Sequence, residues 1–345
     1  MPILETLKSN KTIWDLYTGK EEYDETIIDQ YQRFPYYRSK HRNPFEPEAS
    51  IFLIEKGYDF QYPNGKKFAV CLTHDIDQLN YTMGETVESA LRSLRHGRLG
   101  EASKAFERKT NKKKNPRCNF DEIMEMEKKY NAKSSFYIMA FEDKDLDFNY
   151  DVNELSDQLN KIINMGWEVG LHGGHQAFIN LDALCNQKKK LEKVIGRVVI
   201  GYRNHYMRFK TPTTWELLKD AGFKYDTTFG YHDCVGFRNG MCHPFKPFNL
   251  TTNSKIDIIE IPLVIMDCTL WDYMKLNMES SWAITKQLID TVQKYSGVIT
   301  ILWHNTNMMA KNHDLYEKIL HYCYDKNAWM TSGEEIADHF REFAF

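Results

Sequence analysis

The stretch FAVCLTHDID, residues 68–77, decides the fold, because a short apolar run leads directly into two carboxylates. Such a run is typical of a buried strand. In proteins that alternate strands and helices, catalytic groups gather where the strands end. Asp75 and Asp77 are two residues apart, so on an extended chain their side chains point the same way. One could hold a metal ion while the other acts as a base. A polar loop that caps a helix is the alternative, and the motif alone favours neither.

Further β-rich runs follow, separated by helical patterns. Asn119 and Asn180 are suited to cap two of the helices, and Pro212 to occupy the first position of another. Repeated β–α units predict an α/β fold with a largely parallel sheet, closed or partly closed into a barrel. No strand is followed by a glycine-rich phosphate loop, which argues against nucleotide binding. The seven strand-like runs cover residues 68–72, 134–139, 167–171, 198–202, 224–227, 256–261 and 298–303.

The chain divides into an N-terminal extension and a main domain. Residues 1–66 have no clear period, and we expect them to pack on the barrel of residues 67–345. Residues 84–117 interrupt the barrel pattern as a basic helical insertion. A solvated insertion is the usual meaning of such a charge run. The alternative is an electropositive lid that attracts an anionic substrate, such as a nucleotide- or phosphate-linked sugar.

Composition narrows the class of protein. The chain has 345 residues and a formal net charge of -3, which gives no overall attraction to nucleic acid. Its 7 cysteines include no Cys-x-x-Cys pair, a pattern that favours a reducing compartment over a disulfide framework. The N-terminus lacks the apolar core of a signal peptide, and no apolar run approaches the roughly 20 residues of a membrane span. These features predict a cytoplasmic protein without a membrane span.

Groups suited to metal binding follow later strands. The third run ends in His172 and continues through Gly173-Gly174 to His175. Two imidazoles and a carboxylate can hold a metal ion while leaving positions open for water and substrate. The glycines would permit a tight turn that brings both histidines to one ion. The fourth run ends in Arg203, which can pair with Asp75 and keep it ionised.

Three other polar residues lie near predicted strand ends. His304 ends a very hydrophobic run and is a candidate acid with a pKa near neutrality. Asp267, after the sixth run, could hydrogen-bond a catalytic histidine or cap a turn. His205 could be a metal ligand, a substrate contact or a core histidine. Arg238 lies in a long loop that we expect over the site, where it could contact an anionic group.

In its motifs and their order, the chain resembles the polysaccharide deacetylase family, also called the NodB-homology group or carbohydrate esterase family 4. The resemblance covers roughly residues 67–340. It implies a distorted (β/α) barrel of about seven strands and a divalent metal, usually zinc. The motifs are Asp75-Ile76-Asp77, Leu171-His172-Gly173-Gly174-His175, Gly201-Tyr202-Arg203 and Leu302-Trp303-His304.

The resemblance also implies a role for each motif residue. Asp75 would be the general base, Asp77 a metal ligand and Arg203 the group that orients the base. His304 would be the general acid, and Leu302 would line the acetyl pocket. The substrate-binding residues that we predict are His205, Tyr206, Arg238, Leu302 and Asp267.

Two departures from the family pattern concern the metal. The family's second histidine follows four residues after the first, where this chain has Gln176, and its histidine stands one position earlier, at His175. The motif after Arg203 also lacks the family's proline. We therefore expect Asp77, His172 and His175 as ligands, with His205 and His74 as alternatives for the third.

The function implied is that of a metal-dependent hydrolase of amide bonds. It would remove an N-acyl group, most simply N-acetyl, from a sugar or glycan precursor in surface-polysaccharide biosynthesis. The substrate could be a polymer, or a sugar that is nucleotide-linked or lipid-linked. The alternatives are a catalytically weak or inactive relative that binds sugar, and a related metal-dependent hydrolase of a non-sugar amide.

Overall fold

Nine of the described strands pair into one main sheet in which all neighbouring strands run parallel. The computed structural model describes residues 2–24, 26–111, 114–308, 311–341 and 343. The strand order is β8-β5-β4-β3-β2-β1-β10-β9, and β11 pairs with β1 beside this path. The strands are β1 (Ala69–Ile76), β2 (Ser135–Met139), β3 (Glu168–Gly173), β4 (Gly201–Asn204), β5 (Tyr225–Asp226), β8 (Ile259–Glu260), β9 (Leu263–Met266), β10 (Val298–Leu302) and β11 (Trp329–Thr331).

The sheet closes through one continuous segment of chain. Strands β8 and β9 lie at opposite ends of the strand order, yet only Ile261 and Pro262 separate them in sequence. Proline has no N–H to donate to a ladder, so it breaks this segment into two short strands. Residues 259–266 can be counted as one strand that Pro262 interrupts. Together with β1 to β5 and β10, this strand completes a closed ring of seven strands. The predicted distorted barrel of about seven parallel strands is therefore confirmed.

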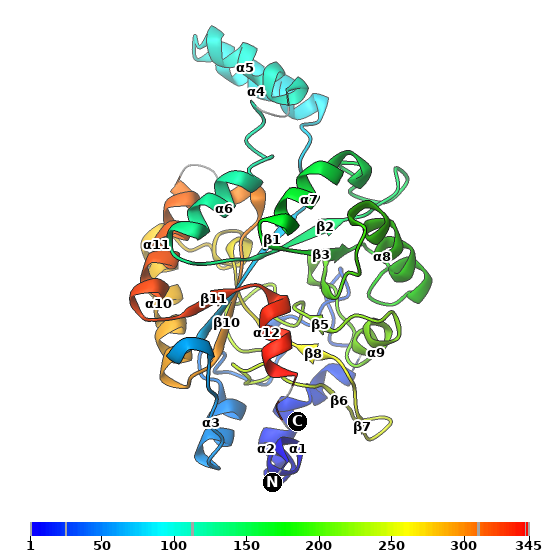
Figure 1. Ribbon diagram of the computed structural model, residues 1–345, viewed down its shortest axis with the longest axis vertical. Coiled ribbons are helices and arrows are strands. Elements are labelled where there is room, and N and C mark those ends of the chain that lie inside the picture. The colour runs from blue at the N-terminus through cyan, green and yellow to red at the C-terminus, as the bar shows by residue number, and fades with distance from the viewer. Residues whose placement is uncertain (1, 25, 112–113, 309–310, 342, 344–345) are drawn as a thin grey trace.

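Helices cover the outside of the barrel (Figure 1). A short antiparallel hairpin, β6 (Phe248–Asn249) with β7 (Ser254–Lys255), lies outside the main sheet. Within the described ranges, no helix is both long and apolar enough to cross a bilayer. The helices are α1 (Ile3–Lys8), α2 (Lys11–Tyr17), α3 (Glu48–Glu55), α4 (Met83–Arg95), α5 (Leu99–Thr110), α6 (Phe120–Lys129), α7 (Ser156–Asn164), α8 (Leu181–Ile195), α9 (Thr213–Asp220), α10 (Met278–Lys294), α11 (Lys311–Asp325) and α12 (Gly333–Phe340).

The barrel interior is filled at the end opposite the strands' carboxyl ends. Cys71, Tyr137 and Tyr225 belong there to one buried cluster with Ile336 and Phe340 of α12. Helix α12 therefore plugs the amino-terminal end of the barrel. The polar residues that follow the strands lie at the opposite end of the barrel, which is therefore available for a functional site.

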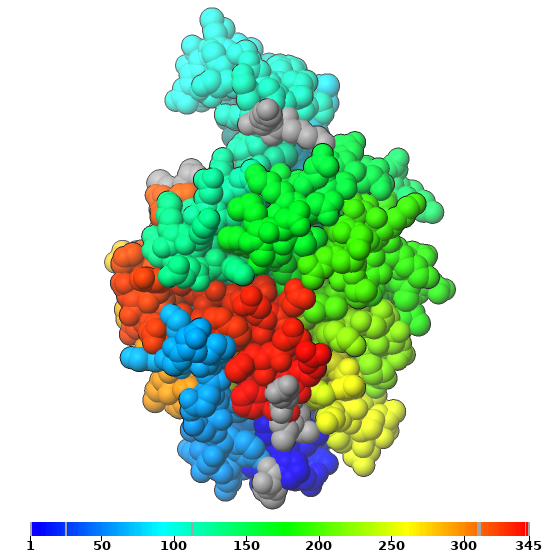
Figure 2. Space-filling model, in the orientation of Figure 1, coloured from blue at the N-terminus to red at the C-terminus, as the bar shows by residue number. Residues whose placement is uncertain are grey.

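The N-terminal segment packs on the barrel, and the insertion projects from it. Leu7, Tyr17 and Leu53 of α1 to α3 belong to the same buried cluster as the barrel's outer face. The predicted helical insertion is the hairpin of α4 and α5, which stands clear of the rest of the molecule (Figures 1 and 2).

Three local features differ from the sequence expectations. The run expected over residues 256–261 forms only β8, and β9 follows beyond Pro262. Strand β11 (Trp329–Thr331) is not among the expected runs, because three residues are too few to show the alternation of side chains that marks a strand. Asn119 precedes α6 as expected but makes no capping bond, since its Oδ1 has no hydrogen-bond partner, and its amide donates to the Asn305 carbonyl at 2.9 Å. Asn119 therefore holds the loop that follows β10 instead of capping its own helix.

Candidate metal centre and active site

Strand β1 directs alternate side chains to opposite sides of the barrel wall. Cys71 belongs to the interior cluster, and Thr73 and Asp75 continue the same face toward the carboxyl end. His74 points outward and is fully buried, with Nε2 2.9 Å from the Glu127 carboxylate. This register removes His74 as a candidate metal ligand, since it lies on the other side of the strand from Asp75.

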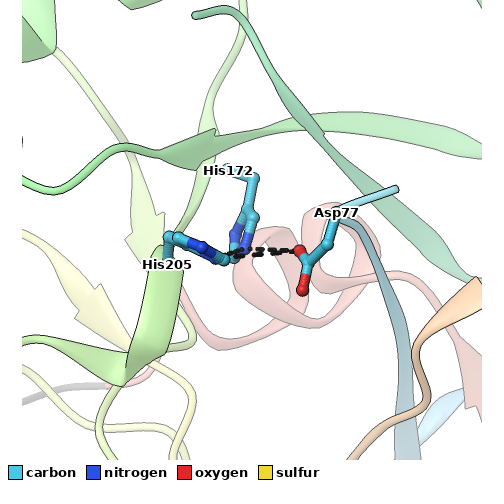
Figure 3. Close-up of side chains that lie close together, drawn as sticks. All are labelled: Asp77, His172 and His205. Atoms are coloured by element: carbon cyan, nitrogen blue, oxygen red, sulfur yellow. Dashed lines mark hydrogen bonds and ion pairs between the residues drawn. The ribbon is translucent and has the colours of Figure 1, made fainter. Parts of the chain in front are cut away.

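Three ligand-type atoms converge just beyond the strand ends (Figure 3). His172 Nε2 lies 3.2 Å from Asp77 Oδ1 and 3.2 Å from His205 Nδ1. The third separation, from His205 Nδ1 to Asp77 Oδ1, is 3.8 Å. Zinc bonds of about 2.0–2.1 Å at tetrahedral angles place ligand atoms about 3.4 Å apart. The three atoms thus match one face of a tetrahedral zinc site, and the fourth position would be open.

Polar groups lie outside the ligand-type atoms of both imidazoles. His172 Nδ1 lies 3.1 Å from the Arg203 carbonyl, and His205 Nε2 lies 3.4 Å from Asp147 Oδ2. Such partners fix the ring and its tautomer in metal sites. Burial lowers the pKa of His205, which favours the neutral form that binds metal. Burial alone would raise the pKa of Asp77, but the histidines around it lower the pKa below its usual range.

The histidine assigned as third ligand from the sequence lies elsewhere. His175 Nε2 is 2.7 Å from Asp147 Oδ2, and His175 is not part of the group that contains Asp77. Gly173 serves close packing, because a side chain there would overlap the Tyr202 hydroxyl. His205 groups with Asp77 and His172, whereas His175 groups with Asp147 and His205, so we propose His205 in place of His175 as the third ligand beside Asp77.

Asp75 lies beside this group with one oxygen exposed to it. Its Oδ2 is 3.6 Å from His172 Nε2, and its buried Oδ1 has no hydrogen-bond partner. The Arg203 guanidinium does not form the predicted ion pair with Asp75. It donates instead to the Thr227 hydroxyl at 3.0 Å and to the Thr73 hydroxyl at 2.9 Å. Because Thr73 precedes Asp75 by two positions on the same face, the cation lies one layer deeper in the barrel.

His304 is held by Asp267 on the far side of the same opening. Its Nδ1 and its backbone N–H both lie 2.7 Å from oxygens of the Asp267 carboxylate. Asn307 donates to the same carboxylate at 2.9 Å. Burial alone would lower the pKa of His304, but the Asp267 charge raises the pKa well above its ordinary value. The free Nε2 lies 3.6 Å from Asp77 Oδ2 and so faces the candidate metal centre.

These groups line one cleft of about 240 Å³. The Tyr206 ring, 38 % exposed, forms part of its wall and offers a flat apolar surface. Leu302 lies behind the wall in a small apolar cluster that includes Met207 and Met266. The cleft thus combines an ionisable floor with an apolar side. Its lining residues are Arg33, Asp75, Asp77, His172, His205, Tyr206, Met207, Met266, Cys268, Asp272, Tyr273 and His304.

The N-terminal segment supplies part of this wall, which the sequence did not indicate. Arg33 donates to the Tyr206 carbonyl and to the Tyr273 hydroxyl, both at 3.3 Å. Its guanidinium also pairs with Asp29 at 2.8 Å. The Tyr31 ring stacks on that of Tyr206, with centroids 5.6 Å apart. No motif or period marks residues 29–33, so only the folded chain reveals their contribution.

Arg238 does not reach the cleft. Its Nε donates to one carboxylate oxygen of Glu22, in the N-terminal segment, at 2.7 Å. One of its Nη atoms donates to the other oxygen of that carboxylate, also at 2.7 Å. A third nitrogen donates to the Gly230 carbonyl at 2.9 Å. The predicted contact between Arg238 and an anionic substrate group is therefore replaced by a buried ion pair within the protein.

Comparison with solved structures places this geometry on a known scaffold. A protein from Mycobacterium smegmatis assigned as a polysaccharide deacetylase matches with a TM-score of 0.57 and 17% identity, over 82% of this chain and 93% of that one. The chain has the fold of a polysaccharide deacetylase. Peptidoglycan deacetylase PdaC from Bacillus subtilis matches at a TM-score of 0.36 and 15% identity, over 81% and 94% of the two chains. BA3943 from Bacillus anthracis, a CE4 family pseudoenzyme, matches at 0.41 and 13%, over 81% and 67%.

Comparison of sequences gives no further match. No family model matches the chain, and no curated protein is similar to it. The polysaccharide deacetylase fold therefore rests on the arrangement of the backbone, and the chemistry has to be argued from the side chains.

Proposed function

We propose that the protein is a metal-dependent deacetylase that removes an N-acyl group, most simply N-acetyl, from a sugar or glycan precursor. One observation carries this proposal: Asp77, His172 and His205 converge at the opening of a deacetylase fold. Asp75 and His304 flank them in the same cleft. A general base and a general acid beside a metal centre are the groups that amide hydrolysis needs.

The donor set fits a catalytic zinc ion. Two neutral imidazoles and a carboxylate are a common ligand set for catalytic zinc, with a further position left for water or substrate. When bound, the metal would polarise the amide carbonyl and lower the pKa of water. Asp77, His172 and His205 would hold it, and Asp147 would orient His205 from outside.

Asp75 and His304 would move the protons of the reaction. Asp75 Oδ2, which lies 3.6 Å from His172 Nε2 and so faces the candidate metal centre, would take a proton from the attacking water. The water oxygen then bonds to the carbonyl carbon. His304, kept protonated by Asp267, would give its Nε2 proton to the amide nitrogen as the C–N bond breaks. The products are an amine on the sugar and a carboxylic acid, which passes its proton to the amine or to solvent and leaves as the carboxylate. The proton on Asp75 returns His304 to its charged form through solvent.

The walls of the cleft suit the two parts of such a substrate. The apolar cluster of Met207, Met266 and Leu302 would accept the methyl group of an acetyl substituent. Tyr206, backed by Tyr31, would stack against a sugar ring, since aromatic faces bind the apolar face of such rings. The small volume suits one residue of a glycan at a time.

The cysteines support an intracellular role. All seven are free in the structure, as expected for a protein that works in a reducing compartment. A deacetylase in the cytoplasm would act on a precursor and not on the finished extracellular polymer. We therefore place the reaction in the biosynthesis of a surface polysaccharide.

Acetate release tests the proposal. Chelator-treated protein reloaded with Zn²⁺ would be incubated with N-acetylglucosamine oligomers, and with nucleotide-linked and lipid-linked N-acetyl sugars. We expect acetate from at least one of these from the wild type and from the Asp272→Asn control, whose carboxylate lies in the same cleft. Asp75→Asn should bind the metal normally and release no acetate. Full activity in that variant would refute the assignment of Asp75 as the base.

A sugar-binding relative without hydrolysis is the second candidate, because Arg203 forms no ion pair with Asp75. The base then lacks the direct partner that would keep it ionised. Metal binding and oligosaccharide binding without acetate release from any of these substrates would favour this candidate.

A further inference from the structure

The helical hairpin of α4 and α5 is packed in an unusual way. Its interior consists of small side chains, with Ala90, Ala102 and Ala105 buried between the two helices. Helices normally turn their large apolar side chains inward. Here Leu99 is 73% exposed, Leu91 50% and Phe106 48%. The large apolar side chains exposed on the hairpin are Met83, Val87, Leu91, Leu94, Leu99 and Phe106.

These side chains form one face of the hairpin. Leu91 follows the inward-facing Ala90 by one position, a rotation of about 100° around α4. Phe106 follows the inward-facing Ala105 by the same step in α5. Since the two helices are antiparallel, rotations of the same sense from their shared interface point to the same side. Both apolar stripes therefore lie on one surface, on a hairpin that stands clear of the barrel (Figure 2).

The hairpin and the segment that follows it also carry positive charge. Residues 84–117 contain ten Lys or Arg and four Glu, a net charge of +6, whereas the whole chain carries -3. Of this charge, +2 lies on the hairpin of α4 and α5 (Met83–Thr110) and +4 on residues 111–117 that follow it. Arg92 and Lys104 pair with neighbouring glutamates, but Arg95 and Arg98 form no ion pair within the residues that the structure describes. The apolar face is thus flanked by uncompensated positive charge.

We propose that this apolar, basic hairpin face docks on an anionic lipid bilayer. An amphipathic helical surface of this kind buries its apolar side chains at the boundary of headgroups and acyl chains while its cations attract anionic lipids. A second copy of the chain would cover the apolar side chains but leave Arg95 and Arg98 without an anionic partner, and sedimentation velocity distinguishes it. Nucleic acid would attract the cations but has no apolar surface for Leu91, Leu99 and Phe106.

The neck of the hairpin is fixed to the rim of the cleft. Asn305, the residue after His304, donates through its amide to the Gln78 carbonyl at 2.9 Å, and Asn115 donates to the Leu79 carbonyl at 2.6 Å. Gln78 directly follows Asp77. With 13 residues, α4 extends about 20 Å from this neck. Docking would therefore hold the cleft near the bilayer, where lipid-linked saccharides are found.

Co-sedimentation with vesicles tests the docking directly. The full chain would be mixed with vesicles of phosphatidylcholine alone and of phosphatidylcholine with phosphatidylglycerol. We expect binding to the anionic vesicles only, weakened by added salt. The double variant Leu91→Glu/Phe106→Glu should lower the bound fraction at least tenfold, and Arg95→Gln/Arg98→Gln should weaken binding severalfold. Val198→Glu is the matched control, because Val198 is 65% exposed on the barrel, and it should bind as the wild type does.

Three outcomes would overturn the proposal. The wild type could remain in solution with both kinds of vesicle, or the Leu91→Glu/Phe106→Glu variant could bind as well as the wild type. A dimer in sedimentation velocity that this variant dissociates would assign the face to a second copy. Circular dichroism of each variant would establish that the hairpin is still helical. Vesicle binding and acetate release are measured separately, so either result can fail without the other.

Discussion

The buried ion pair between Glu22 and Arg238 should be one of the strongest links between the N-terminal segment and the barrel. It is bidentate, with both separations 2.7 Å, and its side chains are 5% and 2% exposed. The Arg238 guanidinium also lies 4.3 Å from the centre of the Phe229 ring. Thr211 donates to the same carboxylate at 2.7 Å. Replacement of Glu22 by Gln would preserve the shape and leave a guanidinium in the core without its counter-charge.

The expected loss in the free energy of unfolding follows from the burial of this ion pair. Removal of one partner from a buried, hydrogen-bonded pair typically costs about 3–5 kcal/mol, because the other charge stays desolvated. We therefore expect Glu22→Gln to lower the free energy of unfolding by about 3 kcal/mol or more. The double variant Glu22→Gln/Arg238→Met should lose less than the sum of the two single variants, since it leaves no unpaired charge.

Urea unfolding followed by tryptophan fluorescence and circular dichroism measures these differences. Lys11→Met is the control, since Lys11 pairs with Asp15 at the surface with its side chain 83% exposed. Its removal should change the free energy of unfolding by less than about 1 kcal/mol. A Glu22→Gln variant as stable as the wild type would refute the reasoning. So would a double variant whose loss of stability equals the sum of the losses in the two single variants.

Three further predictions concern the cleft and the barrel core. Asp267→Asn should lower kcat/KM by about 10- to 100-fold at unchanged metal content, because His304 loses its charged partner. Tyr206→Ala should raise KM about tenfold with little change in kcat, through loss of an apolar contact of about 1.5 kcal/mol. Burial raises the pKa of Glu168 from 4.5 to about 7. The stability that this carboxyl contributes is therefore present below pH 4.5 and lost as pH rises through 7. That loss is about 3 kcal/mol in urea unfolding and should be absent in Glu168→Gln.

The sequence predicted the features that follow from the alternation of strands. The apolar runs located most of the barrel strands, and the polar residues at their carboxyl ends gave the positions of Asp75, His172 and His304. Parallel strands bring such ends to one edge, so proximity could be inferred without coordinates. The inward and outward faces of β1 also follow from its period. Only the structure shows that both ring nitrogens of His74 have partners, Nδ1 the Trp303 carbonyl and Nε2 the Glu127 carboxylate.

Features that depend on tertiary packing could not be predicted in the same way. The grouping of His205, and not His175, with Asp77 depends on how the chain folds beyond β3 and β4, and spacing along the chain does not reveal this. Arg33 and Tyr31 enter the cleft from a segment without any period. An arginine such as Arg238 often contacts an anionic ligand. Here, however, it pairs with the carboxylate of Glu22, more than two hundred residues earlier in the chain.

Zinc titration of the ligand variants tests the central claim most directly. Chelator-treated wild-type protein, His175→Gln and His205→Gln would each be titrated with Zn²⁺ in a calorimeter. We predict one bound ion for the wild type and for His175→Gln with similar affinity. His205→Gln should bind more than about 100-fold more weakly, beyond the cost of losing an outer hydrogen-bond partner. Unchanged affinity in His205→Gln together with lost binding in His175→Gln would contradict the metal centre described by Asp77, His172 and His205.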